Sequence, residues 1–173
     1  MARNNAWSNL RLHRACANLT VEEFAATRVS FFPSLRRTLN HILLVDRDYL
    51  GDLKGTGRPI VADQEPFSDP RALAAAQAAT DRELISFCEA LDEAGLGRVV
   101  PIDRRDGVDY RETVQAILSH LFVHQIHHRG QAHAMLAGTR IAPPQLDEFF
   151  LASDSERRKE ELRCLGLGKA NGR

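Results

Sequence analysis

The stretch His-Leu-Phe-Val-His-Gln-Ile-His-His-Arg-Gly-Gln, residues 120–131, contains four of the seven histidines of the chain. His120, His124 and His128 recur every four residues, so on an α-helix they form one slowly drifting stripe with about 40° between successive members. A His-x-x-x-His pair on one helix can chelate a divalent cation, because both imidazoles face the same side. The stretch therefore predicts a long helix that carries a metal site.

A third ligand must come from another helix, because two imidazoles alone hold a cation weakly. His41 is the best-placed candidate, since it lies in an apolar run, residues 39–44, of a second predicted helix. His120 could replace a ligand, but a place in the pocket wall or beside the ligands is favoured. His127 is rotated about 60° from His124 on the helix and is expected to pack or to reach a neighbouring helix.

Two polar side chains near the histidines are candidate supports for the site. Ligating imidazoles usually donate their second N–H to an acceptor, and Gln131 has the right face for this role. Arg129 can only donate, and is predicted to pair with a carboxylate such as Asp46 or Asp48. The full set of predicted supporting or pocket residues is His120, His127, Gln131, Arg129 and Asn40.

Apolar periodicity extends the helical prediction to the whole chain. The predicted helices cover residues 4–17, 34–50, 70–94 and 110–137, with a brief helical turn at the Thr20 capping box. Gly51, Gly95 and Gly138 are the predicted stops and Asp109 is the predicted cap of the last helix. Residues 51–68 are rich in glycine and proline and form a long connection, and residues 99–102 are extended without a partner strand.

Four substantial helices and no convincing sheet predict an all-α four-helix bundle over residues 1–152. Short additional helical segments follow near the C-terminus, and residues 153–173 form a polar tail, loose from Gly166 onward. Asp46 and Gln77 lie among the inward-facing residues of their helices, whereas His13 and His133 are predicted to be solvated. An apolar cluster is expected to dock on the bundle: Leu146, Phe149, Phe150 and Leu151.

Composition excludes several classes of function. Lys and Arg number 23 and Asp and Glu number 23, so no net charge attracts nucleic acid. No window approaches the roughly 20 apolar residues of a membrane span, and no signal peptide is evident, which predicts a cytoplasmic protein. Three widely spaced cysteines favour reduced thiols. Position 125 is glutamine, which cannot act as the base of a His-Glu-x-x-His peptidase, and no nucleotide-binding or serine hydrolase motif is present.

The histidine-bearing segments resemble those of the DinB/YfiT-like superfamily of metal-binding bundles. The resemblance rests on residues 38–43 with Asp46-Arg47, on residues 124–131, on Trp7 with Asn9, and on residues 143–147. It implies that His41, His124 and His128 bind a divalent metal, in a cytosolic and often homodimeric protein. Some relatives are transferases or isomerases that use low-molecular-weight thiols such as bacillithiol or mycothiol. Tyr49 departs from the tryptophan frequent in relatives, which affects the predicted shape of the pocket.

These observations predict a metal-dependent enzyme of the thiol S-transferase or isomerase type, acting on a small electrophile, with Zn, Ni or Fe as the metal. A metal-bound water or thiolate would be the reacting group, and no catalytic side chain can be named. Two alternatives remain open. One is metal-assisted hydrolysis with His120 as the only nearby base, and the other is a non-enzymatic bundle with a structural or sensory metal.

Overall fold

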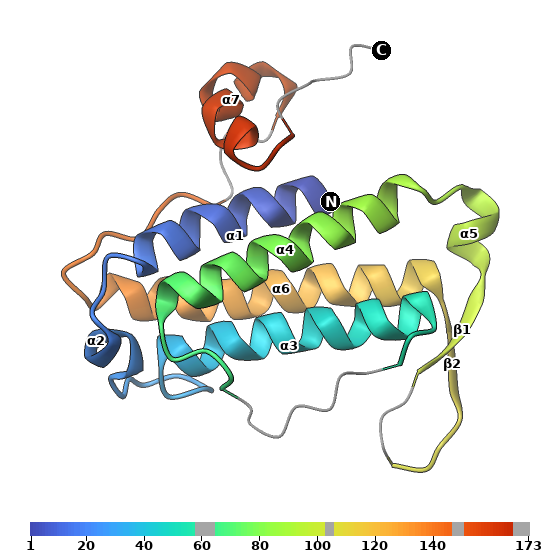
Figure 1. Ribbon diagram of the computed structural model, residues 1–173, viewed down its shortest axis with the longest axis horizontal. Coiled ribbons are helices and arrows are strands. Elements are labelled where there is room, and N and C mark those ends of the chain that lie inside the picture. Colours follow the sequence, from blue (N-terminus) through green and yellow to red (C-terminus); the bar gives the residue numbers. More distant parts are fainter. Residues whose placement is uncertain (58–64, 103–105, 147–150, 168–173) are drawn as a thin grey trace.

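The computed structural model describes residues 1–57, 65–102, 106–146 and 151–167, and these contain four long helices (Figure 1). The elements in chain order are α1 (Ala2–Cys16), α2 (Val21–Ala25), α3 (Leu35–Lys54), α4 (Pro70–Glu89), α5 (Glu93–Gly97), β1 (Val99–Ile102), β2 (Tyr110–Thr113), α6 (Val114–Ala137), a 3-10 turn (Ala152–Asp154) and α7 (Ser155–Cys164). The prediction of a helical bundle is confirmed.

The four long helices pair into two layers. The most extensive packing joins α1 to α4 and α3 to α6, and smaller contacts of α3 with α4 and of α1 with α6 close the bundle. In Figure 1, α1 and α4 accordingly lie together above α6 and α3. The seam between α1 and α4 is therefore opposite the seam between α3 and α6.

Helices α3 and α4 end at residues other than those predicted. Helix α3 continues through the buried Gly51 to Lys54, and it ends at Gly55, whose φ of 69° is the left-handed conformation that glycine adopts without strain. Helix α4 ends at Glu89, and Gly95 lies inside the separate helix α5. A new helix starts there because the Asp92 side chain accepts a hydrogen bond from the Gly95 N–H at 2.7 Å.

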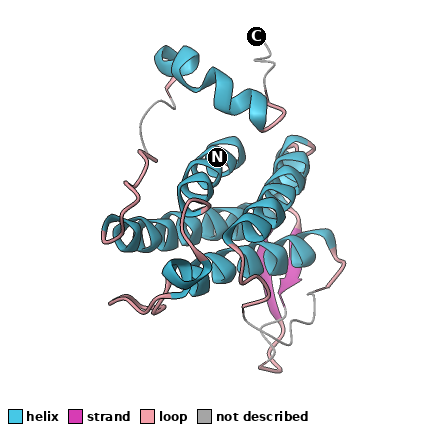
Figure 2. Ribbon diagram, turned by 60° about the vertical axis from the view of Figure 1, so that its left-hand side comes forward, coloured by secondary structure: helices cyan, strands magenta, loops and turns pink. Residues whose placement is uncertain are grey.

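The extended segment 99–102 has a partner, contrary to prediction. Strand β1 pairs antiparallel with β2 (magenta in Figure 2), so that Val99 lies opposite Thr113 and Ile102 opposite Tyr110. Helix α6 consequently begins at Val114 and not at Tyr110. Its cap is Thr113, whose hydroxyl accepts from the Ala116 N–H at 3.2 Å, and not Asp109.

The apolar core has two parts. One part lies around the fully buried Trp7, Leu53 and Leu121, and the other around Phe24, Leu39 and Leu136. Polar side chains at the middle of all four long helices are buried in the same bundle, and we call this set the buried polar layer: Asn5, Asn9, Asp46, Gln77, Asp81, Gln125 and Arg129. The inward positions predicted for Asp46 and Gln77 are confirmed.

Hydrogen bonds within the buried polar layer connect the four helices. Gln77 Nε2 donates to Asp46 Oδ2 at 2.9 Å and to Asp81 Oδ1 at 3.2 Å. Gln125 Nε2 also donates to Asp46 Oδ2. Asn9 Nδ2 donates to Asp81 Oδ1 at 3.0 Å. The layer therefore joins α4 and α6 to Asp46 on α3, and α1 to Asp81 on α4.

The C-terminal segment packs on the bundle. Leu165, which directly follows α7, is buried against the core part around Trp7, and Leu162 and Leu167 pack there as well. Glu161 accepts a hydrogen bond from Trp7 Nε1 at 2.5 Å. The predicted loose tail is therefore wrong for Leu167, and α7 has an anchored face.

The apolar cluster predicted after the last long helix is found only in part. In the predicted apolar cluster, Leu146 packs on the core while Leu151 is exposed, and Phe149 and Phe150 lie outside the described residues. No helix in the described part of the chain has the length and apolar character needed to cross a membrane.

Candidate metal centre

Three histidines meet at the seam between α3 and α6. His41 comes from the first half of α3, and His124 and His128 come from successive turns of α6. One ligand nitrogen from each lies within 4.8 Å of the other two, and this is the cluster of possible metal ligands found among the described residues. His41 Nε2 and His124 Nε2 are 3.0 Å apart. The structure thus brings together the three residues predicted as ligands.

All three imidazoles are suited to bind a cation because their surroundings favour the neutral form. Burial lowers the pKa of His41 to about 4 and that of His124 to about 3, and repulsion from the neighbouring histidines adds to both shifts. Burial also lowers the pKa of His128, although its contact with Gln131 acts in the opposite direction. A neutral imidazole has a free nitrogen lone pair, so these groups are available as ligands at neutral pH.

The spacing fits a single transition metal ion. Two nitrogens bound to one cation at about 2.0–2.1 Å are about 3 Å apart at right angles and about 3.3–3.4 Å apart at the tetrahedral angle. The His41 and His124 nitrogens have the first of these separations. Three imidazole nitrogens with this spacing form a donor set that can hold a divalent transition metal.

Gln131 contacts two of the histidines. Its Oε1 lies 2.8 Å from His128 Nδ1, and its Nε2 lies 3.1 Å from His127 Nε2. An amide oxygen only accepts, so the His128 proton belongs on Nδ1 and Nε2 keeps its lone pair. His127 is exposed and touches the edge of the site through Gln131 and through its ring contact with His128, 4.8 Å between centroids.

Phe32 covers one side of the cluster, and the sequence did not identify it. Its ring centroid lies 4.5 Å from that of His41 and 5.6 Å from that of His128. Phe31 packs edge-on against Phe32 at 4.9 Å and is itself exposed. The residues Phe31-Phe32-Pro33 between two predicted helices could have suggested an apolar cover, but the helical pattern marks them only as a break.

The remaining predicted pocket residues differ in their distance from the histidines. His120 is exposed, and its ring centroid lies 6.4 Å from that of His124 and 5.5 Å from that of Tyr49. Asn40 is fully buried, but it binds the connection before α4, because its side chain donates to the Phe67 carbonyl at 2.8 Å and accepts from the Phe67 N–H at 3.0 Å. It therefore fixes the backbone beside the site.

Arg129 belongs to the buried polar layer and not to the histidine cluster. It donates to Asn5, to Asn9 at 3.1 Å and to Gln125 at 3.0 Å. Burial lowers its pKa to about 10, and the charge of Asp81 opposes this shift more than that of Asp46. The hydrogen bonds of Arg129 thus go to amide oxygens and not to the predicted carboxylates, and among the described residues Asp81 and then Asp46 act on it through their charge.

The two histidines predicted to be solvated are not exposed. His13 is 4% exposed and lies between α1 and α4. His133 is half-buried, with Nε2 3.0 Å from the Pro144 carbonyl oxygen. Each of these histidines is covered by a segment other than its own helix, and the periodic pattern within one helix cannot predict such a contact.

Two kinds of comparison with known proteins give matches. The model of the DinB family matches residues 1–160. A solved structure described as a DinB-like protein from Bacillus cereus ATCC 10987 has a TM-score of 0.61 and 16% identity, and the match covers 80% of this chain and 90% of that chain. No curated protein matches the chain.

Proposed function

The chain belongs to the DinB family, and from this premise we propose that it is a metal-dependent enzyme that transfers a small thiol to an electrophilic substrate. His41, His124 and His128 would hold the divalent cation. The observation that carries the proposal is the meeting of three imidazole nitrogens within 4.8 Å at the α3/α6 seam. The thiol-dependent reaction follows from the family resemblance described above.

The donor set leaves room for a reactant. Three neutral imidazoles occupy at most three positions of a cation that takes four or more ligands, which is typical of catalytic and not of structural sites. A cation in this place would supply Lewis acidity, so that a thiol beside it ionises at neutral pH. In the transfer, the thiolate sulfur forms a bond to the electrophilic carbon, the leaving group departs with its electron pair, and the thiol proton passes to solvent.

The surrounding side chains have definite tasks in this proposal. Gln131 holds the His128 ring with its lone pair on Nε2. Phe32 excludes water from one side of the cluster and offers an apolar surface to the substrate. Asn40, which directly precedes His41, fixes the Phe67 backbone and so holds the connection before α4 against α3. No side chain is assigned as a general base.

The first experiment is elemental analysis of untagged protein purified without chelator. About one transition metal per chain is expected, with loss of the metal in the double variant His124→Ala/His128→Ala. His120→Ala is the matched control, because His120 is an exposed histidine one turn away on the same helix, and its metal content should equal that of the wild type. Absence of metal in the wild type, even after reconstitution with Zn, Ni or Fe, would exclude the proposal.

A second measurement tests the reaction itself. The metal-loaded protein is incubated with a low-molecular-weight thiol and a chromogenic electrophile such as 1-chloro-2,4-dinitrobenzene, and His41→Ala should abolish turnover while the circular dichroism spectrum stays unchanged. Turnover of an ester without any thiol would favour metal-assisted hydrolysis. A bound metal without turnover, combined with a large fall in melting temperature on chelation, would favour a structural site.

The assembly and location are part of the same proposal. We propose a cytoplasmic homodimer that acts on a small molecule, as the family resemblance implies. Light scattering coupled to size-exclusion chromatography should give about twice the chain mass of 19.3 kDa. A mass of one chain at micromolar concentration would refute the dimer and leave the metal site untouched.

A further inference from the structure

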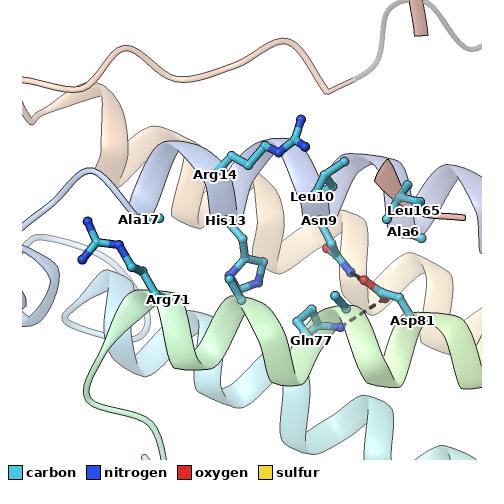
Figure 3. A pocket seen from close by; sticks show the side chains of 12 residues that line it. Ala6, Asn9, Leu10, His13, Arg14, Ala17, Arg71, Gln77, Asp81 and Leu165 are labelled. Atoms are coloured by element: carbon cyan, nitrogen blue, oxygen red, sulfur yellow. Dashed lines mark hydrogen bonds between the residues drawn. The ribbon is translucent and has the colours of Figure 1, made fainter. Parts of the chain in front are cut away.

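A cavity of about 150 Å³ lies between α1 and α4, at the seam opposite the histidine cluster (Figure 3). A single water needs only about 10–15 Å³ on this measure, so the cavity is large enough for a small organic molecule. Its apolar walls include Ala6, Leu10, Ala74 and Ala78. Nothing in the proposed thiol transfer uses this space.

Two buried side chains that line this cavity have polar atoms without a hydrogen-bond partner. His13 is 4% exposed and Gln77 is 1% exposed, and both line it. His13 Nδ1, His13 Nε2 and Gln77 Oε1 lack hydrogen-bond partners within the described residues. Figure 3 shows the His13 ring reaching from α1 toward α4, on the same side as Gln77. Leaving a buried polar atom unpaired is destabilising, so these three atoms call for a hydrogen-bonding partner, and the cavity beside them has room for one.

The charges of the buried polar layer indicate the sign of the charge on a ligand in this cavity. The buried polar layer contains the carboxylates of Asp46 and Asp81 but only one cation, Arg129. Burial lowers the pKa of His13 to about 4, so this ring is neutral at pH 7 and adds no positive charge. Burial raises the pKa of Asp81 to about 6, and burial together with repulsion from Asp81 raises that of Asp46 to about 7. The layer therefore has one uncompensated negative charge above about pH 7, where both carboxylates are ionised. Asp81 lines the cavity, and a cation bound there would supply the missing charge.

The hydrogen-bonding groups that line the cavity favour the same kind of ligand as the charges do. Gln77 Oε1 only accepts, and a neutral His13 ring offers one acceptor and a single donor. The Asp81 carboxylate also only accepts; it already accepts from Asn9 and Gln77, and its Oδ2, which accepts from Asn9 at 3.2 Å, has a further lone pair for a ligand. A ligand that satisfies them must donate several hydrogen bonds. The alkyl part of such a ligand would meet the alanine walls. Arg14 and Arg71 also line the cavity, but their side chains are exposed and in Figure 3 both guanidinium groups point away from the floor formed by Gln77 and Asp81.

We propose that the cavity between α1 and α4 binds a small molecule with a protonated primary amine, whose ammonium group donates to Asp81 and Gln77. The alkyl part lies against Ala6, Ala74 and Ala78. Free alkylamines and α-amino acids share this chemistry. An amino acid also has a carboxylate, which the arginines at the rim would attract.

The test is an NMR titration of the full-length protein with ethylammonium chloride, followed through the backbone amides of α1 and α4. Ethanol and propionate are matched controls without the amine. A ligand of so few atoms binds no tighter than about millimolar, so NMR is the suitable method. Saturable shifts with ethylammonium, and none with ethanol or propionate, are expected. Tighter binding of alanine than of ethylammonium would identify amino acids as the source, and the reverse order would identify simple amines.

Two variants locate the ligand. Ala78→Leu fills the cavity and should weaken binding at least tenfold, while Ala79→Leu makes the same change at the next, exposed position of α4 and should leave binding unchanged. Asp81→Asn removes the carboxylate at constant shape and should also weaken binding at least tenfold. Absence of saturable shifts in the wild type, or equal binding by wild type, Ala78→Leu and Asp81→Asn, would overturn the proposal. Metal content, measured in each variant, should not change, so failure here is distinct from failure of the metal site.

Discussion

Replacing Asp46 by asparagine should make the protein more stable than the wild type at neutral and alkaline pH, and the gain should disappear in acid. Asp46 is fully buried and accepts hydrogen bonds from Gln77 and Gln125. Burial, and secondly repulsion by Asp81, raises its pKa from 3.8 to about 7. The folded state therefore holds the Asp46 proton more tightly than the unfolded chain does.

The sign and size of the effect follow from this shift. A carboxyl group with a raised folded-state pKa contributes stability that is complete below pH 3.8 and is lost as the pH rises through about 7. One pKa unit corresponds to about 1.4 kcal/mol, so the full loss is about 4 kcal/mol. Asparagine cannot ionise and keeps a donor like that of the protonated acid. The stability difference between variant and wild type should therefore grow by about 1.4 kcal/mol per pH unit from pH 4 to 7, and then level off.

The assay is urea denaturation of both proteins across pH 4 to 8, followed by circular dichroism in the presence of a chelator. The titration of groups distant from Asp46 cancels in the difference between the two proteins. Asp81 repels Asp46 and shares Gln77 with it, so its titration contributes to the difference. Glu112→Gln, at an exposed position of β2, is the control and should differ from the wild type by less than about 0.5 kcal/mol at every pH. A pH-independent difference for Asp46→Asn would refute the reasoning, because it would mean that Asp46 is ionised without penalty in the folded protein.

Three further predictions concern single contacts. Gln131→Leu removes the acceptor for His128 Nδ1 and should weaken Zn affinity about 10- to 100-fold, measured by competition with a chromophoric chelator; unchanged affinity would show that the contact does not orient the ring. Gly55→Ala places a Cβ at a φ of 69° and should lower the free energy of unfolding by about 1 kcal/mol in urea, with equal stability contradicting the strain. Leu165→Ala removes an anchor of α7 from the core, so trypsin should cleave within α7 earlier than in the wild type, while an identical digestion pattern would show that α7 is held by other contacts.

The helical period explains why much of this fold could be predicted from the sequence. His124 and His128 are one turn apart and must share a face of any helix that contains them. His41 lies beside the buried Ile42 and Leu43 on α3, so packing of α3 against α6 places it near that face. These are properties of single helices, and they place the cluster before the exact packing is known.

Features that depend on pairing between distant segments could not be predicted in the same way. Both Asp109 and Thr113 are good helix caps, and the choice between them is made by the pairing of β1 with β2, whose residues come from separate parts of the chain. Phe32 reaches the histidines from a connection with no periodic pattern. The partners of Arg129 depend on which helix lies opposite α6, and this is decided by the whole bundle.

The buried polar layer and the histidine cluster are linked through the rotation of α6. Gln125 directly follows His124, and Arg129 directly follows His128, so each ligand has a layer residue about 100° away on the helix. The contacts of Gln125 with Asp46 and of Arg129 with Asn9 hold one face of α6 against α1 and α3. A rotation of α6 by one residue would leave these polar groups unpaired and would also turn both histidines away from His41. We infer that the layer, although its buried charge reduces stability, selects the single orientation of α6 in which the three histidines meet.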